Sequence, residues 1–143
     1  MKINVTQLIP DSVLPTLGTP GAGCFDVYST NTHPVCIAPG SGQVFGTGLA
    51  FEIPVGHVLL VFSRSGHGFK SGVRLANCVG VLDSDYRGEL KVKLTADSAA
   101  YTVVPFERIA QIMVLPVPSI SFELVDRLSE TERGEGGFGS SGK

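Results

Sequence analysis

The hydrophobic positions of this chain come in short runs that often alternate with polar residues. Residues 89–95 alternate in this way, and so do residues 120–124. In the first segment three apolar side chains share one face: Leu90, Val92 and Leu94. The runs at 58–62 and 109–115 are almost continuously apolar, which is typical of a strand covered on both faces. The pattern therefore predicts several short β-strands.

Turn-forming residues separate these runs. The chain has 18 glycines and 9 prolines spread along its length, a composition that disfavours long helices. Turn signals at 39–42 and 54–56 fall between the predicted strands. Residues 64–71 can form one short helix, which their glycines weaken. Many short strands with frequent turns predict a single all-β domain, as a sandwich, jelly roll or barrel.

The end of the chain has a different composition. From about residue 129 it is rich in glycine and serine, is nearly devoid of apolar side chains and contains one aromatic residue, Phe138. Composition by itself favours a flexible tail. We therefore divide the chain into a β domain, residues 1–128, and a C-terminal arm, residues 129–143.

The composition narrows the function classes. The 143 residues suffice for one domain with a sizeable core, and 43% apolar against 17% charged residues indicate a globular chain. A net charge of -2 gives no general attraction to nucleic acid or to an anionic membrane, and we expect neither as a partner. A polyanionic ligand would need a few well-placed cations and backbone amides.

Cysteine usage and the N-terminus indicate a reducing compartment. Three cysteines cannot all pair, and the grouping of Cys24, His33 and Cys36 offers too few ligands for a structural zinc site. The N-terminus lacks the apolar stretch of a signal peptide, and no apolar run approaches the roughly 20 residues that span a bilayer. We expect a cytoplasmic protein, or one in a host cell's nucleotide compartment if a virus encodes it.

Residues 63–66 are the first candidate for chemistry. Arg64, Ser65 and Gly66 together can offer a charge, a hydroxyl donor and an unobstructed backbone amide to a phosphate. Taken alone, the segment is more simply interpreted as a polar turn after a strand. His67 follows directly and is a further candidate for a phosphate contact.

Residues 80–89 form the second candidate. Asp83 can accept a proton from water, and Tyr86 can present a flat ring to a sugar or base. The alternative is a hairpin whose aspartates cap turns.

Two further segments carry polar groups at suggestive places. Residues 107–111 bring an arginine and Gln111 into a buried strand, either for function or for an ion pair at a subunit contact. In residues 133–142, Arg133 and Ser140 can meet phosphate oxygens, and Phe138 can stack on a base, whereas the alternative is disorder.

Together with a segment around Asp26, these segments resemble, in their order, the five motifs of the homotrimeric dUTPase family. The matching residues are 23–29, 63–66, 77–89, 107–111 and 133–142. The resemblance runs from about residue 21 to residue 142, nearly the whole chain. One glycine-rich match would be weak evidence, but five in the right order are specific, and the third is the most specific.

Three departures from the family's pattern are visible. Cys24 stands in the first motif where glycine is usual, and Ser63 stands where the second motif has proline. Phe106 and Glu107 precede the arginine of the fourth motif, where Gly-Asp or Gly-Glu is common. None of these removes a candidate catalytic group.

The resemblance implies a jelly-roll-like β-clip fold and hydrolysis of dUTP to dUMP and pyrophosphate, which lowers dUTP and supplies dUMP for dTMP synthesis. Water attacks the α-phosphorus, Asp83 is the general base, and Tyr86 lies against the deoxyribose and excludes a 2′-hydroxyl. The hairpin between Asn77 and Tyr86 pairs its backbone with uracil. Mg²⁺ organises the triphosphate, and Asp26 holds it through water.

The implied oligomer is a homotrimer whose active sites are shared between subunits, with the C-terminal arm closing as a lid. The implied substrate-binding residues are Arg64, Ser65, Gly66, Asn77, Gly80, Leu82, Asp83, Tyr86, Gln111, Arg133, Phe138, Gly139 and Ser140.

Three other functions compete with this interpretation. A dCTP deaminase, or a bifunctional enzyme, shares the implied fold but activates water at the base with a glutamate. A binding or regulatory protein can use the same scaffold without turnover. A purely structural β subunit fits the composition but not the five motifs.

Overall fold

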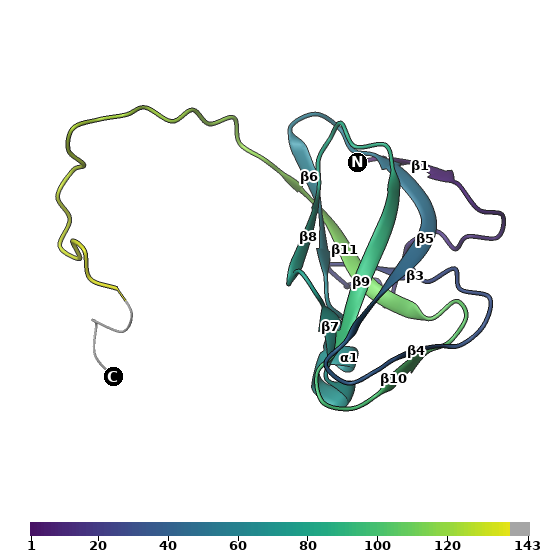
Figure 1. Ribbon diagram of the computed structural model, residues 1–143. Coiled ribbons are helices and arrows are strands. Elements are labelled where there is room, and N and C mark those ends of the chain that lie inside the picture. The colour runs from purple at the N-terminus through teal and green to yellow at the C-terminus, as the bar shows by residue number, and fades with distance from the viewer. Residues whose placement is uncertain (138–143) are drawn as a thin grey trace.

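Two antiparallel β-sheets pack against each other around the apolar side chains (Figure 1). The computed structural model describes residues 1–137. The larger sheet has the order β2-β3-β11-β6-β8, from strands β2 (Thr16–Leu17), β3 (Phe25–Tyr28), β11 (Arg108–Pro116), β6 (His57–Phe62) and β8 (Val79–Leu82). The predicted continuous runs thus become β6 and β11, which are neighbouring interior strands of this sheet.

The second sheet has the order β1-β5-β9-β7. Its strands are β1 (Asn4–Gln7), β5 (Gly42–Glu52), β9 (Glu89–Ala96) and β7 (Val73–Leu75). In β9 the predicted alternation is confirmed, because Leu90, Val92 and Leu94 are buried while Lys91 and Lys93 are exposed. A short ladder of β10 (Tyr101–Val103) with β4 (Val35–Ile37) lies at one end of the domain.

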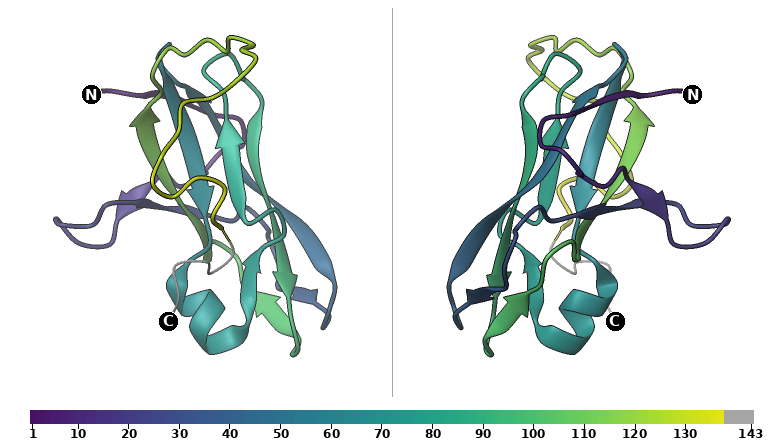
Figure 2. Two further views of the ribbon diagram at one scale, coloured as in Figure 1. Left: turned by 90° about the vertical axis from the view of Figure 1, so that its left-hand side faces the viewer. Right: turned by 90° about the vertical axis from the view of Figure 1, so that its right-hand side faces the viewer.

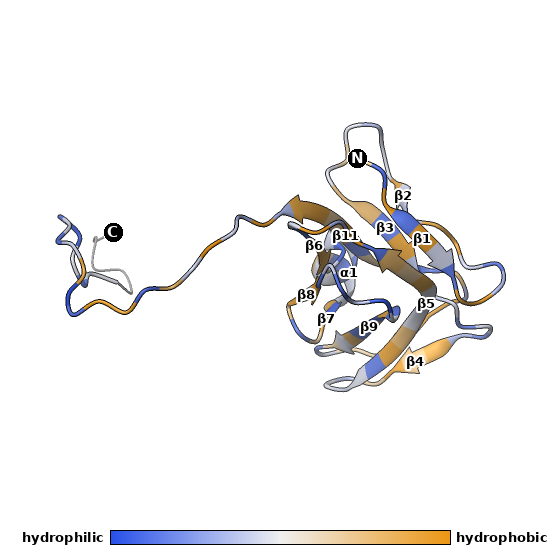
Figure 3. Cartoon of the chain, turned by 90° about the horizontal axis from the view of Figure 1, so that it is seen from above, coloured by the Kyte–Doolittle hydropathy of each residue, from blue (hydrophilic) through white to orange (hydrophobic). Residues whose placement is uncertain are grey.

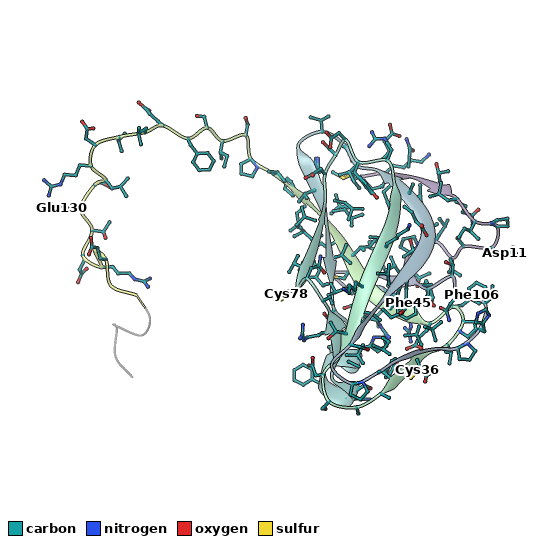
Figure 4. The ribbon with its side chains drawn as sticks, viewed as in Figure 1. Asp11, Cys36, Phe45, Cys78, Phe106 and Glu130 are labelled. Atoms are coloured by element: carbon teal, nitrogen blue, oxygen red, sulfur yellow. The ribbon has the colours of Figure 1, made fainter. Side chains whose placement is uncertain are left out.

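The core fills the space between the sheets. Side chains from both sheets contribute, among them Phe45, Leu59, Leu94 and Ile109, and Phe45 lies inside the domain in Figure 4. This all-β arrangement confirms the predicted fold class. No helix among residues 1–137 is long and apolar enough to cross a membrane.

The short helix predicted at 64–71 is present as α1 (Ser65–Ser71). It ends where Gly72 adopts a left-handed φ of 62°, and the Gly72 N–H donates to the Gly68 carbonyl at 3.2 Å. A glycine takes this conformation without a steric cost. The helix packs below β7, beside the β4–β10 ladder (Figure 2).

The prediction of a strand at 120–124 is wrong for the single chain. Residues 117–137 contain no strand, and they lead away from the domain in Figures 1 and 3. Ile120, Phe122 and Leu124 are exposed by 69%, 95% and 100%. An alternating sequence forms a strand only where a partner edge is present, and residues 1–137 offer none at that place.

Candidate active site

A cavity of about 570 Å³ opens between the β8 segment, residues 77–86, and β9. It is lined by five residues of the predicted substrate-binding set: Asn77, Gly80, Leu82, Asp83 and Tyr86. The wall on the other side comes from β9, including Leu90 and Val92. The structure therefore gathers the third motif around one pocket.

The hairpin expected between Asn77 and Tyr86 is not formed, because β8 pairs with β6 while β7 and β9 belong to the other sheet. The segment that forms this pocket, residues 77–86, has a tightly bent start. The Val79 N–H donates to the Asn77 carbonyl at 2.7 Å, and Cys78 between them has a left-handed φ of 61°. A non-glycine residue pays for such a conformation with strain, which clusters at functional sites. Cys78 lies at the outer edge of the domain (Figure 4).

β8 is an edge strand, paired only with β6. Alternate backbone N–H and C=O groups on its free side therefore have no strand partner, and an edge of this kind can bond a planar ligand. Gly80 is opposite Val61, and a β-carbon there would be 3.0 Å from the Val61 β-carbon. The absence of a side chain at Gly80 lets β8 lie close to β6.

Asp83 and Tyr86 form a turn at the end of β8. The Tyr86 N–H donates to the Asp83 carbonyl at 3.2 Å, and the Tyr86 hydroxyl donates to the Glu89 carbonyl at 3.2 Å. A β-carbon at Gly88 would collide with the Tyr86 ring, so glycine is needed there. Asp83 is exposed and Tyr86 is about half exposed, so both side chains can meet a ligand.

A second cluster surrounds Asp26, which is 4% exposed. The strand register forms this cluster. Gln111 of β11 lies between Asp26 of β3 and Phe62 of β6, and Arg64 follows Phe62 by two residues. Gln111 donates to Asp26 at 3.2 Å, Arg108 donates to Asp26 at 3.2 Å, and the Arg64 Nε lies 3.4 Å from the same carboxylate.

This cluster, formed by Asp26, Arg64, Arg108 and Gln111, has one positive charge in excess. The Arg108 side chain is 48% exposed and that of Arg64 is 20% exposed. Guanidinium groups with a free face are suited to bidentate contacts with phosphate oxygens. Ser65 and Gly66 are exposed beside Arg64, at the start of α1.

Behind Arg64 lies a group that sequence reasoning missed in part. His67 is 6% exposed, and its Nε2 lies 3.0 Å from the Glu107 Oε1 and 3.3 Å from the Arg64 Nη1. The Tyr101 hydroxyl donates to the same Glu107 oxygen at 2.5 Å. Glu107 belongs to the fourth motif, but no signal in the sequence connects Tyr101 of β10 with it.

Burial sets the protonation of this group. Desolvation lowers the pKa of His67, the Arg64 cation lowers it further, and the Glu107 carboxylate opposes both effects. Burial and the hydrogen bond to Glu107 raise the pKa of Tyr101 to about 12. At neutral pH His67 is therefore uncharged and Tyr101 keeps its proton.

The structure does not bring the two clusters together within one chain. Leu82 pairs with Leu59 near one end of β6, whereas Gln111 pairs with Phe62 at the other end. Asp83 and Gln111 are thus separated by four positions along β6, or roughly 13 Å at about 3.3 Å per residue, and by two strands across the sheet.

The predicted residues of the C-terminal arm are also apart from both clusters. Arg133 donates to the Gly136 carbonyl at 2.7 Å, in a part of the chain that lies away from the domain (Figure 1). Phe138, Gly139 and Ser140 lie outside the described residues.

Two departures from the family's pattern have a structural explanation. Ser63 accepts the Leu75 N–H at 2.9 Å and so ties the end of β6 to β7. Phe106 has a left-handed φ of 57° in the turn from Val104 to Glu107, where glycine is the favoured residue (Figure 4).

The donor groups of the Asp26 cluster bear on a magnesium ion. Within residues 1–137, no group of three or more His, Cys, Asp or Glu side chains is placed to hold a metal. One carboxylate beside two arginines fits an ion held mainly by substrate phosphates and water.

An edge-strand pocket and a cluster of two arginines lie on one all-β scaffold, and such features are suited to a planar group and to phosphate, as in a nucleotide-binding protein. The family model for dUTPase matches residues 11–142. The deoxyuridine 5′-triphosphate nucleotidohydrolase of Nautilia profundicola is 44% identical over 100% of both chains. That of Aeromonas salmonicida is 41% identical over 100% of this chain and 95% of its own.

A solved structure agrees with these relatives. The dUTPase of Staphylococcus bacteriophage 80alpha with dUPNHPP is 26% identical, with a TM-score of 0.88 over 99% of both chains. The chain belongs to the dUTPase family. The predicted family and enzyme class are confirmed.

Proposed function

We propose that this enzyme hydrolyses dUTP to dUMP and pyrophosphate, with the β8 pocket binding the nucleoside and the Asp26 cluster binding the triphosphate. The observation that carries this proposal is the convergence of Asn77, Gly80, Leu82, Asp83 and Tyr86 on one cavity. The membership of the dUTPase family supplies the substrate.

Uracil is recognised by the backbone of the β8 segment, residues 77–86. The free edge of β8 offers both N–H donors and C=O acceptors, which match the alternating acceptors and donor of the uracil edge. Cytosine reverses the polarity at two of these positions. Each buried group left unpaired costs about 1–3 kcal/mol, or roughly 10- to 100-fold in affinity.

Tyr86 selects deoxyribose. Its ring lines the cavity and is fixed by the hydrogen bond to the Glu89 carbonyl and by the lack of a side chain at Gly88. A ring held against the C2′ position leaves no room for a hydroxyl, so UTP is rejected by a steric clash.

Asp83 acts as the general base. Its carboxylate is exposed at the mouth of the pocket and lines the cavity. From there it can orient a water molecule toward the α-phosphorus and accept the proton that this water loses. Pyrophosphate is the leaving group.

Arg64, Ser65, Gly66 and Gln111 hold the triphosphate, with Arg133, Phe138, Gly139 and Ser140 added by the C-terminal arm. Magnesium, when bound, supplies charge neutralisation and a fixed triphosphate conformation. Asp26 is the carboxylate of this chain that would hold it through water. In the structure Asp26 accepts from Arg108 and Gln111 and pairs with Arg64, so metal-bound water would have to share that carboxylate with them.

The active site is assembled between subunits of a homotrimer. Two observations support this. Asp83, which follows β8, and Gln111 of β11 lie beside opposite ends of β6, and residues 117–128 expose an alternating apolar segment. Such a segment is suited to pairing with an edge strand of another copy. The arm that follows is then positioned over a neighbouring pocket.

A nucleotide panel tests the reaction. Pyrophosphate release is measured with dUTP, dTTP, dCTP and UTP in the presence of Mg²⁺, and only dUTP should turn over well. Asp83→Asn should abolish most of the turnover, whereas Asp85→Asn serves as a matched control on the same turn. Comparable rates with dCTP, or an active Asp83→Asn variant, would contradict the assignment.

Complementation tests the shared site. Asp83→Asn and Arg64→Ala should each be nearly inactive alone. Co-expression of the two variants should restore part of the activity, because some sites then combine an intact Asp83 with an intact Arg64 from another subunit. Mixed oligomers that stay inactive would show that one chain supplies both residues.

A further inference from the structure

Buried His67 and the partly buried Tyr101 and Glu107 form a polar group that no step of the proposed reaction uses. The three residues come from α1, β10 and the turn before β11. The His67 and Tyr101 rings lie 5.3 Å apart between centroids at 58°. Arg64 is the charged residue of the Asp26 cluster whose side chain contacts this group, at His67.

The hydrogen bonds determine where the protons lie. The Tyr101 hydroxyl donates to Glu107 Oε1 at 2.5 Å, and the Val104 N–H donates to Glu107 Oε2 at 2.9 Å. The His67 Nε2 faces the same Oε1 at 3.0 Å and donates if it carries the ring proton. The His67 Nδ1 has no partner among the described residues.

This arrangement favours one form of the imidazole. An orphan buried N–H is rarer in proteins than an unused acceptor, so Nδ1 is the bare nitrogen and Nε2 carries the proton. A second proton would have to go on Nδ1, where it finds no acceptor. His67 is thus held as a neutral donor to Glu107.

The position of Arg64 follows from this. Its Nη1 donates to the Arg108 carbonyl at 2.9 Å and its Nε faces Asp26. The His67 Nε2 lies 3.3 Å from the Arg64 Nη1 and 3.0 Å from the Glu107 Oε1, so His67 contacts both charged groups. Three donors satisfy the Glu107 carboxylate without Arg64. The guanidinium therefore keeps its charge on the side of the Asp26 cluster.

We propose that neutral His67 is a positioning residue for Arg64: it occupies Glu107 and so prevents an ion pair that would draw the guanidinium out of the triphosphate site. This inference rests on the proposed function, since it assigns Arg64 to the triphosphate. Without the imidazole, Arg64 turns toward Glu107, and the phosphate loses its charge-assisted hydrogen bonds.

Acid has a related effect. The charged groups that face His67 are Arg64 from the start of α1, and Glu107 and Arg108 from the turn and strand packed against it. Tyr101 on β10 remains protonated. A protonated His67 would be a cation in contact with the Arg64 guanidinium, and the repulsion would weaken triphosphate binding as the pH falls.

Steady-state kinetics with dUTP and Mg²⁺ test the proposal. His67→Leu should raise KM about tenfold or more, because charge-assisted hydrogen bonds to phosphate are lost, while kcat changes much less. His67→Gln keeps an N–H donor for Glu107 without a titrating group. It should keep KM close to the parent value and remove the part of the acid rise in KM that is due to His67.

A second variant separates positioning from damage to the fold. In His67→Leu/Glu107→Gln the competing carboxylate charge is gone, so KM should return toward the parent value. An unchanged KM in His67→Leu would overturn the proposal, and so would a failure of Glu107→Gln to rescue it. If His67→Leu does not fold, an acid rise in KM that is the same in His67→Gln and the parent overturns it. If the parent itself releases no pyrophosphate from dUTP, the proposed function fails first.

Discussion

Replacing Gly80 by alanine tests whether strand β8 is the element that binds uracil. Gly80 lies opposite Val61 in the β6–β8 ladder, and both residues line the cavity. The new β-carbon would lie 3.0 Å from the Val61 β-carbon and 3.8 Å from the Asn77 amide nitrogen. The added methyl therefore meets two walls of the pocket at once.

The magnitude follows from the geometry. Directly opposite β-carbons in an antiparallel pair are normally about 4.5–5.5 Å apart. Val61 is 3% exposed and belongs to β6, which is held on both sides, so β8 has to move outward. Overpacking of this kind costs about 1–3 kcal/mol of stability. Each hydrogen bond to the base edge that is lost costs a further about 1–3 kcal/mol of binding, so KM should rise about tenfold or more.

Two measurements on each protein decide the outcome. Pyrophosphate release gives KM and kcat for dUTP, and thermal unfolding gives Tm, which should fall by roughly 2–4 °C per kcal/mol. The matched control is Gly21→Ala, which makes the same chemical change at an exposed position where the new β-carbon has nothing within 4 Å. Its KM and Tm should stay close to those of the parent.

One result would refute the reasoning. If Gly80→Ala lowers Tm but leaves KM for dUTP unchanged, then β8 moves without disturbing the base, and the base is bound elsewhere. If the KM for dUTP and the inhibition constant Ki of inorganic triphosphate rise by the same factor, the effect also lies outside the uracil pocket.

Four further changes have defined outcomes. Tyr86→Ala should reduce the ratio of kcat/KM for dUTP over UTP by about tenfold or more, and an unchanged ratio would remove Tyr86 from sugar selection. Phe106→Gly should be more stable than Phe106→Ala by about 1 kcal/mol and so have the higher Tm, because only glycine adopts the left-handed φ of 57° without strain. Equal melting temperatures would count against strain at this position. Burial lowers the pKa of His67, so the unfolded chain takes up a proton first as the pH falls below about 6.5. As the pH falls below about 6.5, the parent should therefore lose stability relative to His67→Gln, by about 1.4 kcal/mol for each pH unit by which folding lowers the pKa of His67. The difference in stability should level off below the folded pKa, and parallel curves of stability against pH would contradict this prediction. Deleting residues 133–143 should cripple turnover of dUTP but leave the circular dichroism of the β domain intact, and full activity would exclude a role for the arm in closure.

The hydrophobic pattern predicted the strands well where both partners belong to this chain. The alternation at 89–95 became β9, and the continuous runs became β6 and β11, because burial of apolar side chains on a given face depends on local periodicity. At 120–124 the same pattern produced no strand, since a strand also needs an edge to pair with, and the rest of the chain supplies none there.

The sequence by itself determined the family, the all-β fold class and the residue types of the site, because five short motifs and a two-residue periodicity are local properties of a chain. The tertiary structure decided which of those residues meet. Sheet order and register placed Gln111 between Asp26 and β6, separated Asp83 from that cluster, and brought Tyr101 to His67. These contacts join residues that are 34 to 85 positions apart in the sequence, and only the folding of the sheets brings such residues together in space.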